Sequence, residues 1–463
     1  MPVMDHVAYL AGTLGPRGST TAQERAAAEY AARVFQDLGL EPRVERFRSA
    51  TSAWRPFAVA TGGMLLMLPL FFLGGPAGRW LAALGVFFLV ACTALELTFT
   101  PNPLRLLVPK GWSQNVYAVL PPAGPARRRV ILCGHLDTHR TPWAFSSLQA
   151  LRIYRALVTW GLPGAVGMGL LFLLGAVTGN LAWGGPAALP ALLLAAVFAM
   201  AVQADLTPYT PGANDNATGA GLVLALAERL RREPLEQTEV WALCTGCEEV
   251  GAYGAADFVR RHADLGRPFF IVLDTVGGPG SGPCFLVQET MLVPFRSDPA
   301  LLALAERVAR ERPELGAYRW PNFRGAYTDG APAASRLAGS LPGEPSAGRG
   351  APPLAPALGR PGEPGPGRPG PDRGLRMGPA GRHRPGAGPV RGPGDGGRRR
   401  FWGAAVGAGA PPPGCLRPRG VLGRRGRDLA RTNPFSDPTT LAYAGPGDRT
   451  GPLRGDRGLR TGG

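Results

Sequence analysis

Two adjacent carboxylates in residues 244–255, CTGCEEVGAYGA, are the first sign of chemistry in this sequence. Glu248 and Glu249 follow the apolar run 240–243, which is typical of a buried strand. Like charges side by side at a strand end repel each other and lose solvation unless a cation or a shared proton compensates them. The pair therefore predicts a positive group close to the end of this strand.

Three further segments carry metal-ligand side chains at a strand end or just before a helix. VILCGHLDTH ends a predicted strand at His135, with Asp137 two residues later. PGANDNATGAG places Asp215 before a predicted helix, and FFIVLDTVGG ends a predicted strand at Asp274. Taken singly, the histidine is more often a structural residue, and the aspartates are more often a helix cap and a turn acid. Taken together, they would concentrate unpaired negative charge unless cations bind.

A pair of divalent metal ions would supply the missing positive charge. One glutamate of the pair would then be a ligand while its neighbour acts on a metal-bound water, and an aspartate can bridge two ions. The mixture of imidazole and carboxylate favours zinc, with manganese and cobalt as alternatives. Cys244 and Cys247 have CxxC spacing without a second such pair, so we expect them to be structural.

The elements that must position these residues alternate between strands and helices. Strands are predicted at residues 42–47, 115–120, 129–133, 239–243 and 269–273, and helices at 20–38, 217–232 and 252–262. This rhythm predicts an α/β fold with a mixed, largely parallel sheet flanked by helices. In such sheets functional groups gather where the carboxyl ends of strands enter loops, which is where the ligand-type residues lie.

Four apolar stretches are long enough to cross a bilayer, which takes about 20 residues. They cover residues 56–78, 80–100, 157–179 and 182–204, and Glu96 is the one charge within them. Short linkers separate the members of each pair, so we predict two transmembrane helical hairpins that interrupt the α/β domain. Buried core helices are the alternative, although such long uncharged runs exceed the usual globular helix.

Two hairpins return the chain to its starting side, which places all hydrophilic segments in one compartment. Arg79 is the one basic residue between the spans on the far side, and the near side carries Arg43, Arg46, Arg48, Arg55, Arg105, Lys110, Arg152 and Arg155. The positive-inside rule therefore predicts the cytoplasmic side of the membrane. The dispersed cysteines suit a reducing compartment, and the N-terminus shows no signal-peptide pattern.

The strong positive charge does not indicate nucleic-acid binding. The 463 residues carry a formal net charge of +17, with a pI near 10.6. Most of the excess lies after Leu341, in a stretch rich in Gly, Pro and Arg that lacks interleaved aromatic residues. We therefore expect no nucleic acid as a partner, whereas the four apolar stretches predict contact with the lipid bilayer.

The motif order H-x-D, NDNATG, EEVG and LDTVGG resembles that of the M28 family of metallopeptidases, the co-catalytic di-zinc aminopeptidases. Apart from the hairpins, the resemblance runs from AGTLGPRGSTTAQERAAAEYAARVFQDLGL to RGAYTDGAPA. It implies a zinc aminopeptidase-like fold in which His135, Asp215 and Asp274 hold one Zn²⁺. It also implies that Asp215 bridges to a second Zn²⁺ held by Glu249.

The reaction that the resemblance implies is hydrolysis of an N-terminal peptide bond, with a peptide substrate as the partner. Glu248 would be the general base that takes a proton from a metal-bound water and passes it to the leaving amine, and Asp137 would orient His135. The second hairpin lies between the HLDTH loop and PGANDN. We therefore expect an active site close to the cytoplasmic face of the membrane.

The sequence departs from the family after Thr328-Asp329-Gly330, where the family has a histidine that completes the second zinc site. Only His383 follows, in a Gly/Pro/Arg-rich tail without periodicity, which predicts disorder. Either this tail is genuine and contacts anionic lipid headgroups, or a shift of reading frame near residues 331–345 produced it. We favour the frame shift, and the chain as written is expected to lack the last ligand of its second site.

These features divide the chain into a peptidase domain (residues 1–55, 101–154 and 205–335), two transmembrane hairpins (56–100 and 155–204) and a low-complexity tail (336–463). The predicted function is that of a membrane-anchored zinc-dependent peptidase. Three alternatives remain: a catalytically impaired relative that binds a partner, a carboxypeptidase or related amide hydrolase, and a transporter. Glu96, the lone intramembrane charge, is the thin evidence for the transporter.

Overall fold

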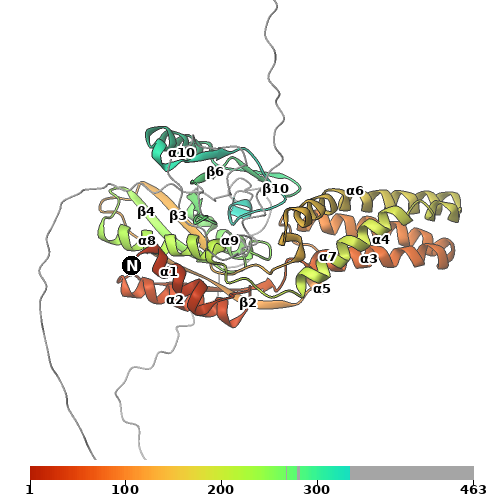
Figure 1. Cartoon of the computed structure of the whole chain (residues 1–463), viewed down its shortest axis with the longest axis horizontal. Helices are drawn as coiled ribbons and strands as arrows, with labels where there is room; N and C mark the ends of the chain where they lie inside the picture. The colour runs from red at the N-terminus through yellow and green to blue at the C-terminus, as the bar shows by residue number, and fades with distance from the viewer. Residues whose placement is uncertain (267, 279–281, 334–463) are drawn as a thin grey trace, which may run out of the picture. The chain divides into compact units, whose positions relative to one another are not determined.

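The computed structural model describes residues 1–266, 268–278 and 282–333, and its centre is a five-stranded sheet (Figure 1). The strands lie in the order β1 (Arg43–Ala50), β2 (Lys110–Leu120), β4 (Thr238–Thr245), β3 (Arg128–His135) and β5 (Phe269–Val272). β3 runs parallel to β4 and β5, whereas β2 is antiparallel to both β1 and β4. The α/β class is confirmed.

The sheet is less parallel than the sequence predicted. Two of its four pairings are antiparallel, because the first pair of apolar helices returns the chain to the end of β1. The register shows this directly, since the last residue of β1, Ala50, pairs with the first residue of β2, Lys110. A helix that crosses over the sheet, which a parallel pairing needs, is absent between these two strands.

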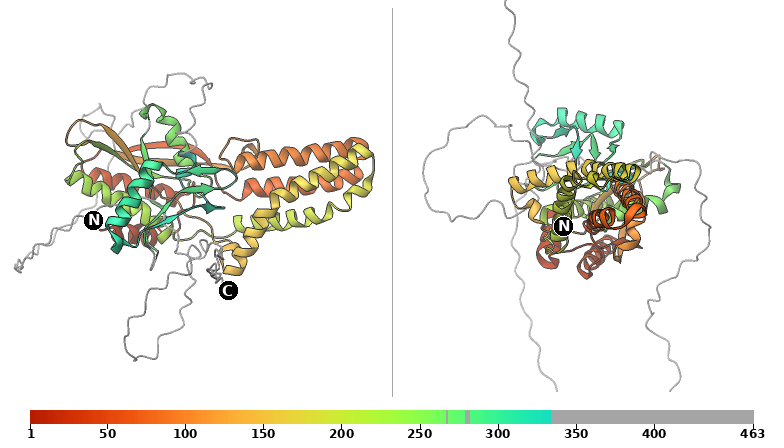
Figure 2. Two further views of the ribbon diagram at one scale, coloured as in Figure 1. Left: turned by 90° about the horizontal axis from the view of Figure 1, so that it is seen from above. Right: turned by 90° about the vertical axis from the view of Figure 1, so that its right-hand side faces the viewer.

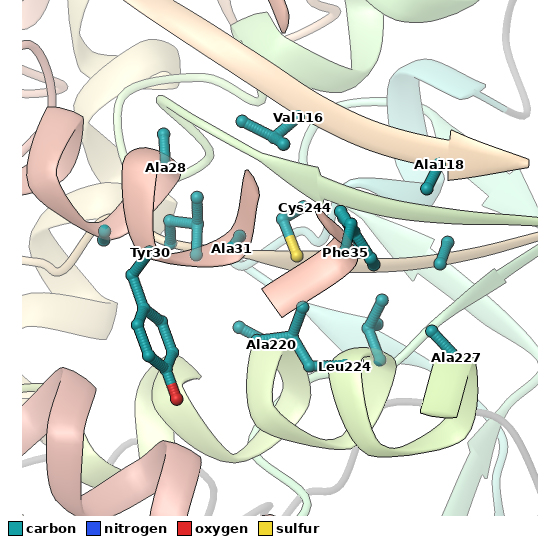
Figure 3. Close-up of a cluster of buried hydrophobic side chains, with 14 of the residues drawn as sticks. Ala28, Tyr30, Ala31, Phe35, Val116, Ala118, Ala220, Leu224, Ala227 and Cys244 are labelled. Atoms are coloured by element: carbon teal, nitrogen blue, oxygen red, sulfur yellow. The ribbon is translucent and has the colours of Figure 1, made fainter. Parts of the chain in front are cut away.

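Helices cover both faces of the sheet, and alternate strand residues serve the two faces. On one face Val116, Ala118 and Cys244 pack against α2 (Ala22–Asp37) and α8 (Gly219–Arg232), as Figure 3 shows, together with α1 (Val3–Val7) and the π-helical turn η1 (Ala8–Leu14). On the other face Tyr117 and Leu243 pack against α9 (Tyr253–Arg261). This two-residue period is that of a strand buried on both sides.

Four long apolar helices pack together as a bundle (Figure 2). They are α3 (Arg55–Leu73), α4 (Gly75–Glu96), α6 (Leu148–Thr178) and α7 (Ala188–Asp205), with the short turn η3 (Leu181–Gly184) before α7. All four are long and apolar enough to cross a membrane, yet only 28% of the most apolar window of each is buried. Apolar side chains such as Leu66 and Leu189 point outward, which differs from the all-round burial of a core helix.

Ion pairs lie at the ends of these helices. Glu96 is the last residue of α4, and its Oε2 is 2.8 Å from Nε of Arg105. The span predicted at residues 80–100 therefore ends earlier, and its charge is paired at the helix end. Asp205, the last residue of α7, has one carboxylate oxygen 2.7 Å from Nε of Arg55 and the other 3.8 Å from Nε of Arg140.

The remaining elements follow β5 or are short. Two small sheets, in the orders β10–β7–β8 and β6–β9, were not predicted from the sequence. Their strands are β6 (Cys284–Leu286), β7 (Gln288–Thr290), β8 (Pro294–Arg296), β9 (Tyr318–Trp320) and β10 (Phe323–Arg324). The helical elements are α5 (Leu104–Leu107), η2 (Trp143–Phe145), η4 (Ala213–Thr218), η5 (Ala263–Leu265), α10 (Pro299–Glu311) and η6 (Pro313–Leu315). The predicted tail at 336–463 lies outside the described residues, and the domain ranges stay a prediction.

Candidate metal centre

The carboxyl ends of β4, β3 and β5 lie side by side at one edge of the sheet, because β3 is parallel to both neighbours. His135 is the last residue of β3 and pairs with Thr245, the last residue of β4. Glu248 follows β4 after a turn in which Cys247 has a φ of 57°. Asp274 follows the end of β5 by two residues. The sheet thus brings together the side chains that the sequence placed at strand ends.

Asp215 reaches the same place from η4, the turn that precedes α8. The next residue, Asn216, fixes this turn, since its amide nitrogen donates to the carbonyl oxygen of Leu273 (2.9 Å) and its amide oxygen accepts from the backbone N–H of Gly219 (2.9 Å). Gly219 leaves no room for a side chain, because a Cβ there would lie 2.0 Å from the oxygen of Leu273. The start of α8 therefore packs directly on the end of β5.

The two ring nitrogens of His135 have different surroundings. Nδ1 lies 3.1 Å from the backbone oxygen of Asp137, which can only accept, so in the neutral ring Nδ1 carries the proton. Nε2 lies 3.2 Å from Oδ1 of Asp215, 3.8 Å from Oδ2 of Asp274 and 3.9 Å from Oε2 of Glu248. A tetrahedral zinc ion with bonds of about 2.0–2.2 Å holds its ligand atoms about 3.3–3.6 Å apart. The spacing around Nε2 is close to that requirement.

The carboxylate of Asp137 holds the backbone of the glutamate pair. Its Oδ1 accepts from the N–H of Glu248 (3.0 Å), and its Oδ2 accepts from the N–H of Glu249 (3.1 Å) and from the hydroxyl of Ser19 (2.6 Å). Oδ1 is 3.5 Å from Nδ1 of His135, farther than the backbone oxygen. Asp137 therefore positions both the histidine and the two glutamates, the latter through a contact that the sequence did not predict.

Burial and mutual repulsion raise the pKa values of both glutamates in this cluster. Burial raises the pKa of Glu248 well above its usual value, and the charges of Glu249 and Asp329 add to the effect. Burial and Asp215 likewise raise the pKa of Glu249. Burial would lower the pKa of His135, but hydrogen bonds to carboxylates hold it well above its usual value. The same contact lowers the pKa of Asp215 despite burial. One imidazole thus offsets only part of the negative charge.

A buried arginine that the sequence did not single out lies beside the cluster. The guanidinium of Arg17 donates to the backbone oxygens of Leu136 (2.8 Å), Pro211 (2.8 Å) and Gly212 (3.1 Å). It thereby ties the loop after β3 to the loop that carries Asp215. Burial lowers the pKa of Arg17 to about 10, so the group stays charged at neutral pH. Its side-chain hydrogen bonds go to carbonyl oxygens, so it acts on the carboxylates from a distance.

The described residues contain three overlapping groups of side chains that could each hold a metal ion, and within each group the ligand atoms lie within 4.8 Å of one another. The groups are His135, Asp215 and Asp274; His135, Glu248 and Glu249; and His139, Asp215 and Glu249. Oε1 of Glu248, Oε1 of Glu249 and Nε2 of His139 are buried and have no hydrogen-bond partner among these residues. Leaving such atoms unsatisfied costs about 1–3 kcal/mol each, more when they are charged. Zinc fits this donor set, since cations would satisfy these atoms and neutralise the excess charge.

His139 was not predicted as a site residue. It lies in the loop that follows His135, at the end of HLDTH, and its Nε2 is 3.9 Å from Oδ2 of Asp215. The available signal was a second imidazole four residues after the first. The structure does not test whether the chain lacks the family's ligand after Gly330, because residues 334–463, including His383, lie outside the part of the chain that it describes.

Asp329 of the TDG segment is fully buried beneath the site. Its Oδ2 accepts from the hydroxyl of Thr245 (2.5 Å), and burial raises its pKa to about 6. Cys244 and Cys247 are buried, and burial raises the pKa of both thiols. Neither cysteine belongs to a candidate metal group within the described ranges, and their structural role stays a prediction.

Residues 199–314 match the model of peptidase family M28. This segment contains Asp215, Glu248, Glu249 and Asp274, and it begins after His135. No curated protein matches the chain.

Among solved structures, the chain is similar to a glutaminyl cyclase from an Acidobacteriales bacterium (13% identity, TM-score 0.39, covering 72% of this chain and 75% of that chain). It is also similar to an aminopeptidase from Aneurinibacillus sp. strain AM-1 (13% identity, TM-score 0.39, 72% and 82%). A third is BSAP, a zinc aminopeptidase from Bacillus subtilis (14% identity, TM-score 0.39, 72% and 82%).

Proposed function

Because the chain is an M28 metallopeptidase-like protein, we propose that it is a membrane-anchored, zinc-dependent peptidase that hydrolyses N-terminal peptide bonds. One observation carries the proposal: His135, Asp215 and Asp274 converge at the strand ends beside Glu248, whose Oε1 is buried without a partner among the described residues. A structural cluster of carboxylates gains nothing from such an unsatisfied oxygen. A catalytic site gains from it, because the free oxygen can accept a proton.

In this proposal His135, Asp215 and Asp274 hold one zinc ion, and Asp215 and Glu249 border a second position. Asp215 suits the shared role because its Oδ1 faces His135, whereas its Oδ2 lies on the side of His139. Zinc, when bound, polarises a substrate carbonyl and lowers the pKa of water. Everything else in the reaction falls to side chains of this protein.

Glu248 is the proton carrier of the proposed reaction. Its backbone N–H is held by Asp137 (3.0 Å), so the side chain starts from a fixed point, and Oε2 lies 3.9 Å from Nε2 of His135. The free Oε1 takes a proton from the attacking water and delivers it to the leaving amine. The backbone oxygen of Asp137 keeps the proton of His135 on Nδ1, so Nε2 stays available as a ligand.

The proposed site lies close to the membrane. Arg140, in the loop after β3, forms an antiparallel bridge with Tyr209, and Thr141 N–H donates to the oxygen of Pro208 (2.9 Å), three residues after the end of α7. Arg140 also approaches Asp205, the last residue of α7. If α7 spans the bilayer, this loop is held at the membrane surface, and the distribution of basic residues supports the cytoplasmic side.

Cysteine labelling tests this location. The five cysteines within the described residues are all buried, so with Cys415 replaced by serine a cysteine introduced at Thr141 or Thr207 should dominate the signal. We expect slow reaction with a water-soluble maleimide in liposomes and faster reaction after detergent is added. If the rates at both positions in liposomes equal those measured after detergent is added, the loop lies away from the bilayer.

Peptide hydrolysis tests the activity. The full chain, purified in detergent and loaded with zinc, is incubated with one peptide in three forms: free, N-acetylated and C-amidated. We expect the first residue to be released from the free and amidated forms only, with loss of activity after chelation and recovery with zinc. Cleavage of the acetylated but not the amidated form would indicate a carboxypeptidase. No cleavage of any form by the zinc-loaded protein would favour the partner-binding alternative.

A further inference from the structure

We propose that His139 completes the second zinc position, together with Asp215 and Glu249, in place of the histidine that the family has shortly after the TDG segment. The inference rests on the proposed function, because it concerns the ligands of the same centre. It changes the expectation drawn from the sequence, which left the second position without its last ligand. A loop between β3 and the bundle would supply what the family takes from a later part of the chain.

The geometry around Asp215 supports two positions rather than one. Nε2 of His135 is 3.2 Å from Oδ1 of Asp215, and Nε2 of His139 is 3.9 Å from Oδ2. The two imidazoles therefore approach different oxygens of one carboxylate, as ligands on either side of a bridging aspartate would. A carboxylate oxygen of Glu249 lies within 4.8 Å of the ligand atoms of His139 and Asp215. These three donors can enclose a second ion.

The imidazole of His139 is prepared for this role. Its Nδ1 is in short contact with the backbone oxygen of Arg140, which can only accept a hydrogen bond, so in the neutral ring Nδ1 carries the proton. Nε2 then has a free lone pair, and it is buried with no partner among the described residues. The side chain is 13% exposed. This combination of one nitrogen bonded to a carbonyl and the other free is typical of histidine ligands.

The backbone around His139 is held on both sides. The carbonyl oxygen of His139 accepts from the N–H of Thr210 (2.9 Å), and Arg140 pairs with Tyr209, over whose ring its guanidinium lies at 4.4 Å. The ring of Phe145 meets the imidazole edge-on, with 6.1 Å between centroids. The segment 209–210 leads directly into the loop of Asp215, so the histidine and the shared carboxylate are fixed to each other.

Elimination points to the same residue. The chain contains five histidines, and His135 already belongs to the first position. Nδ1 of His6 is 2.7 Å from the hydroxyl of Tyr30, and Nε2 of His262 is 3.0 Å from a carboxylate oxygen of Glu45. Neither histidine belongs to a candidate metal group within the described ranges. His383 lies outside the described residues. Within the described ranges, His139 is the histidine left to serve a second position.

Zinc titration of the full chain in detergent tests the inference. Metal-free wild-type protein and His139→Gln, His139→Lys, His262→Gln and His383→Gln variants are titrated with Zn²⁺ against a chromophoric chelator. We expect two equivalents for wild type and for the last two variants. In both His139 variants the second equivalent should bind more than about 100-fold more weakly while the first is retained, since even outer-shell partners are worth 10–100-fold. Lysine keeps a positive charge. If His139 only neutralises the charge of Asp215, the second equivalent should therefore bind to His139→Lys as tightly as to wild type.

Each other outcome has a definite meaning. Two tight equivalents in the His139 variants, or loss of the second equivalent in His383→Gln, overturn the inference and leave the proposed function standing. No tight zinc in the wild type removes the proposed function as well. A single wild-type equivalent that the His139 variants retain also overturns the inference. Thermal unfolding of the metal-free proteins controls for misfolding, because a folded His139 variant should unfold close to the wild-type temperature.

Discussion

The start of α8 offers a sharp test of how the site is positioned. Gly219 has helical backbone angles (φ −67°, ψ −48°), so alanine meets no conformational strain there, but its Cβ would lie 2.0 Å from the carbonyl oxygen of Leu273. It would also lie 2.4 Å from Oδ1 of Asn216. An ordinary contact needs about 3.4 Å, so the helix start and the end of β5 must separate by about 1.4 Å. Because backbone forms one side of the contact, no rotamer change relieves it.

That displacement separates the carriers of two proposed ligands, since Leu273 precedes Asp274 and Asn216 follows Asp215. Overpacking costs about 1–3 kcal/mol. About 0.4–1 kcal/mol of this is offset, because alanine lowers the conformational entropy of the unfolded chain. We therefore expect Gly219→Ala to lower the free energy of unfolding by about 1–2 kcal/mol. Functional geometries tolerate about 0.5 Å, so zinc affinity should fall at least about 10-fold.

Gly12→Ala is the matched control. Gly12 is exposed in η1, and a Cβ there would have no heavy atom within 4 Å. The same chemical change should therefore leave zinc affinity unchanged and stabilise the protein slightly. Both variants are compared by thermal unfolding and zinc competition in one detergent. If Gly219→Ala behaves like Gly12→Ala in both assays, the close packing of α8 on β5 does not position the site.

Three further outcomes follow from single side chains. Glu248→Gln should lower kcat by about 100-fold to 10,000-fold while zinc equivalents stay unchanged, as measured by initial rates and titration; retained activity would remove Glu248 as proton carrier. Asp215→Ala should lose tight zinc from both positions, and retention of either equivalent argues against a shared carboxylate. Burial raises the pKa of Glu289 from 4.5 to about 7. Between these pH values the folded protein holds a proton that the unfolded chain has released, so the free energy of unfolding falls as the pH rises from about 4.5 to 7. Glu289→Gln should therefore unfold at a higher temperature relative to wild type at pH 8 than it does at pH 5. If the difference between variant and wild type is the same at both pH values, Glu289 is ionised when folded.

The ligand-type residues at strand ends were predictable because the rule behind them depends on little else. A run of apolar residues ending in His135 or Asp274 marks where a buried strand meets a loop, and parallel strands bring such ends together. The register of β3 with β4 and β5 does this here. Asp215 was predictable from its place before a helix start, although the role of Asn216 in fixing that turn needed coordinates.

The parts that sequence reasoning missed depend on how loops return to the site. His139 approaches Asp215 because Arg140 pairs with Tyr209. In the sequence, Arg140 precedes the second pair of apolar helices and Tyr209 follows it. Arg17 serves the site through backbone carbonyls, which no residue pattern reveals. The antiparallel β2 was missed for a similar reason, since the first apolar pair, and not a crossover helix, connects β1 to it.

X-ray absorption at the zinc edge, measured on the full zinc-loaded chain in detergent, tests whether zinc binds at the strand ends through imidazole and carboxylate ligands. We expect a shell of nitrogen and oxygen at about 2.0–2.2 Å, with imidazole scattering that is reduced in His135→Ala. A sulfur shell near 2.3 Å, or a spectrum that His135→Ala leaves unchanged, would mean that the metal binds elsewhere.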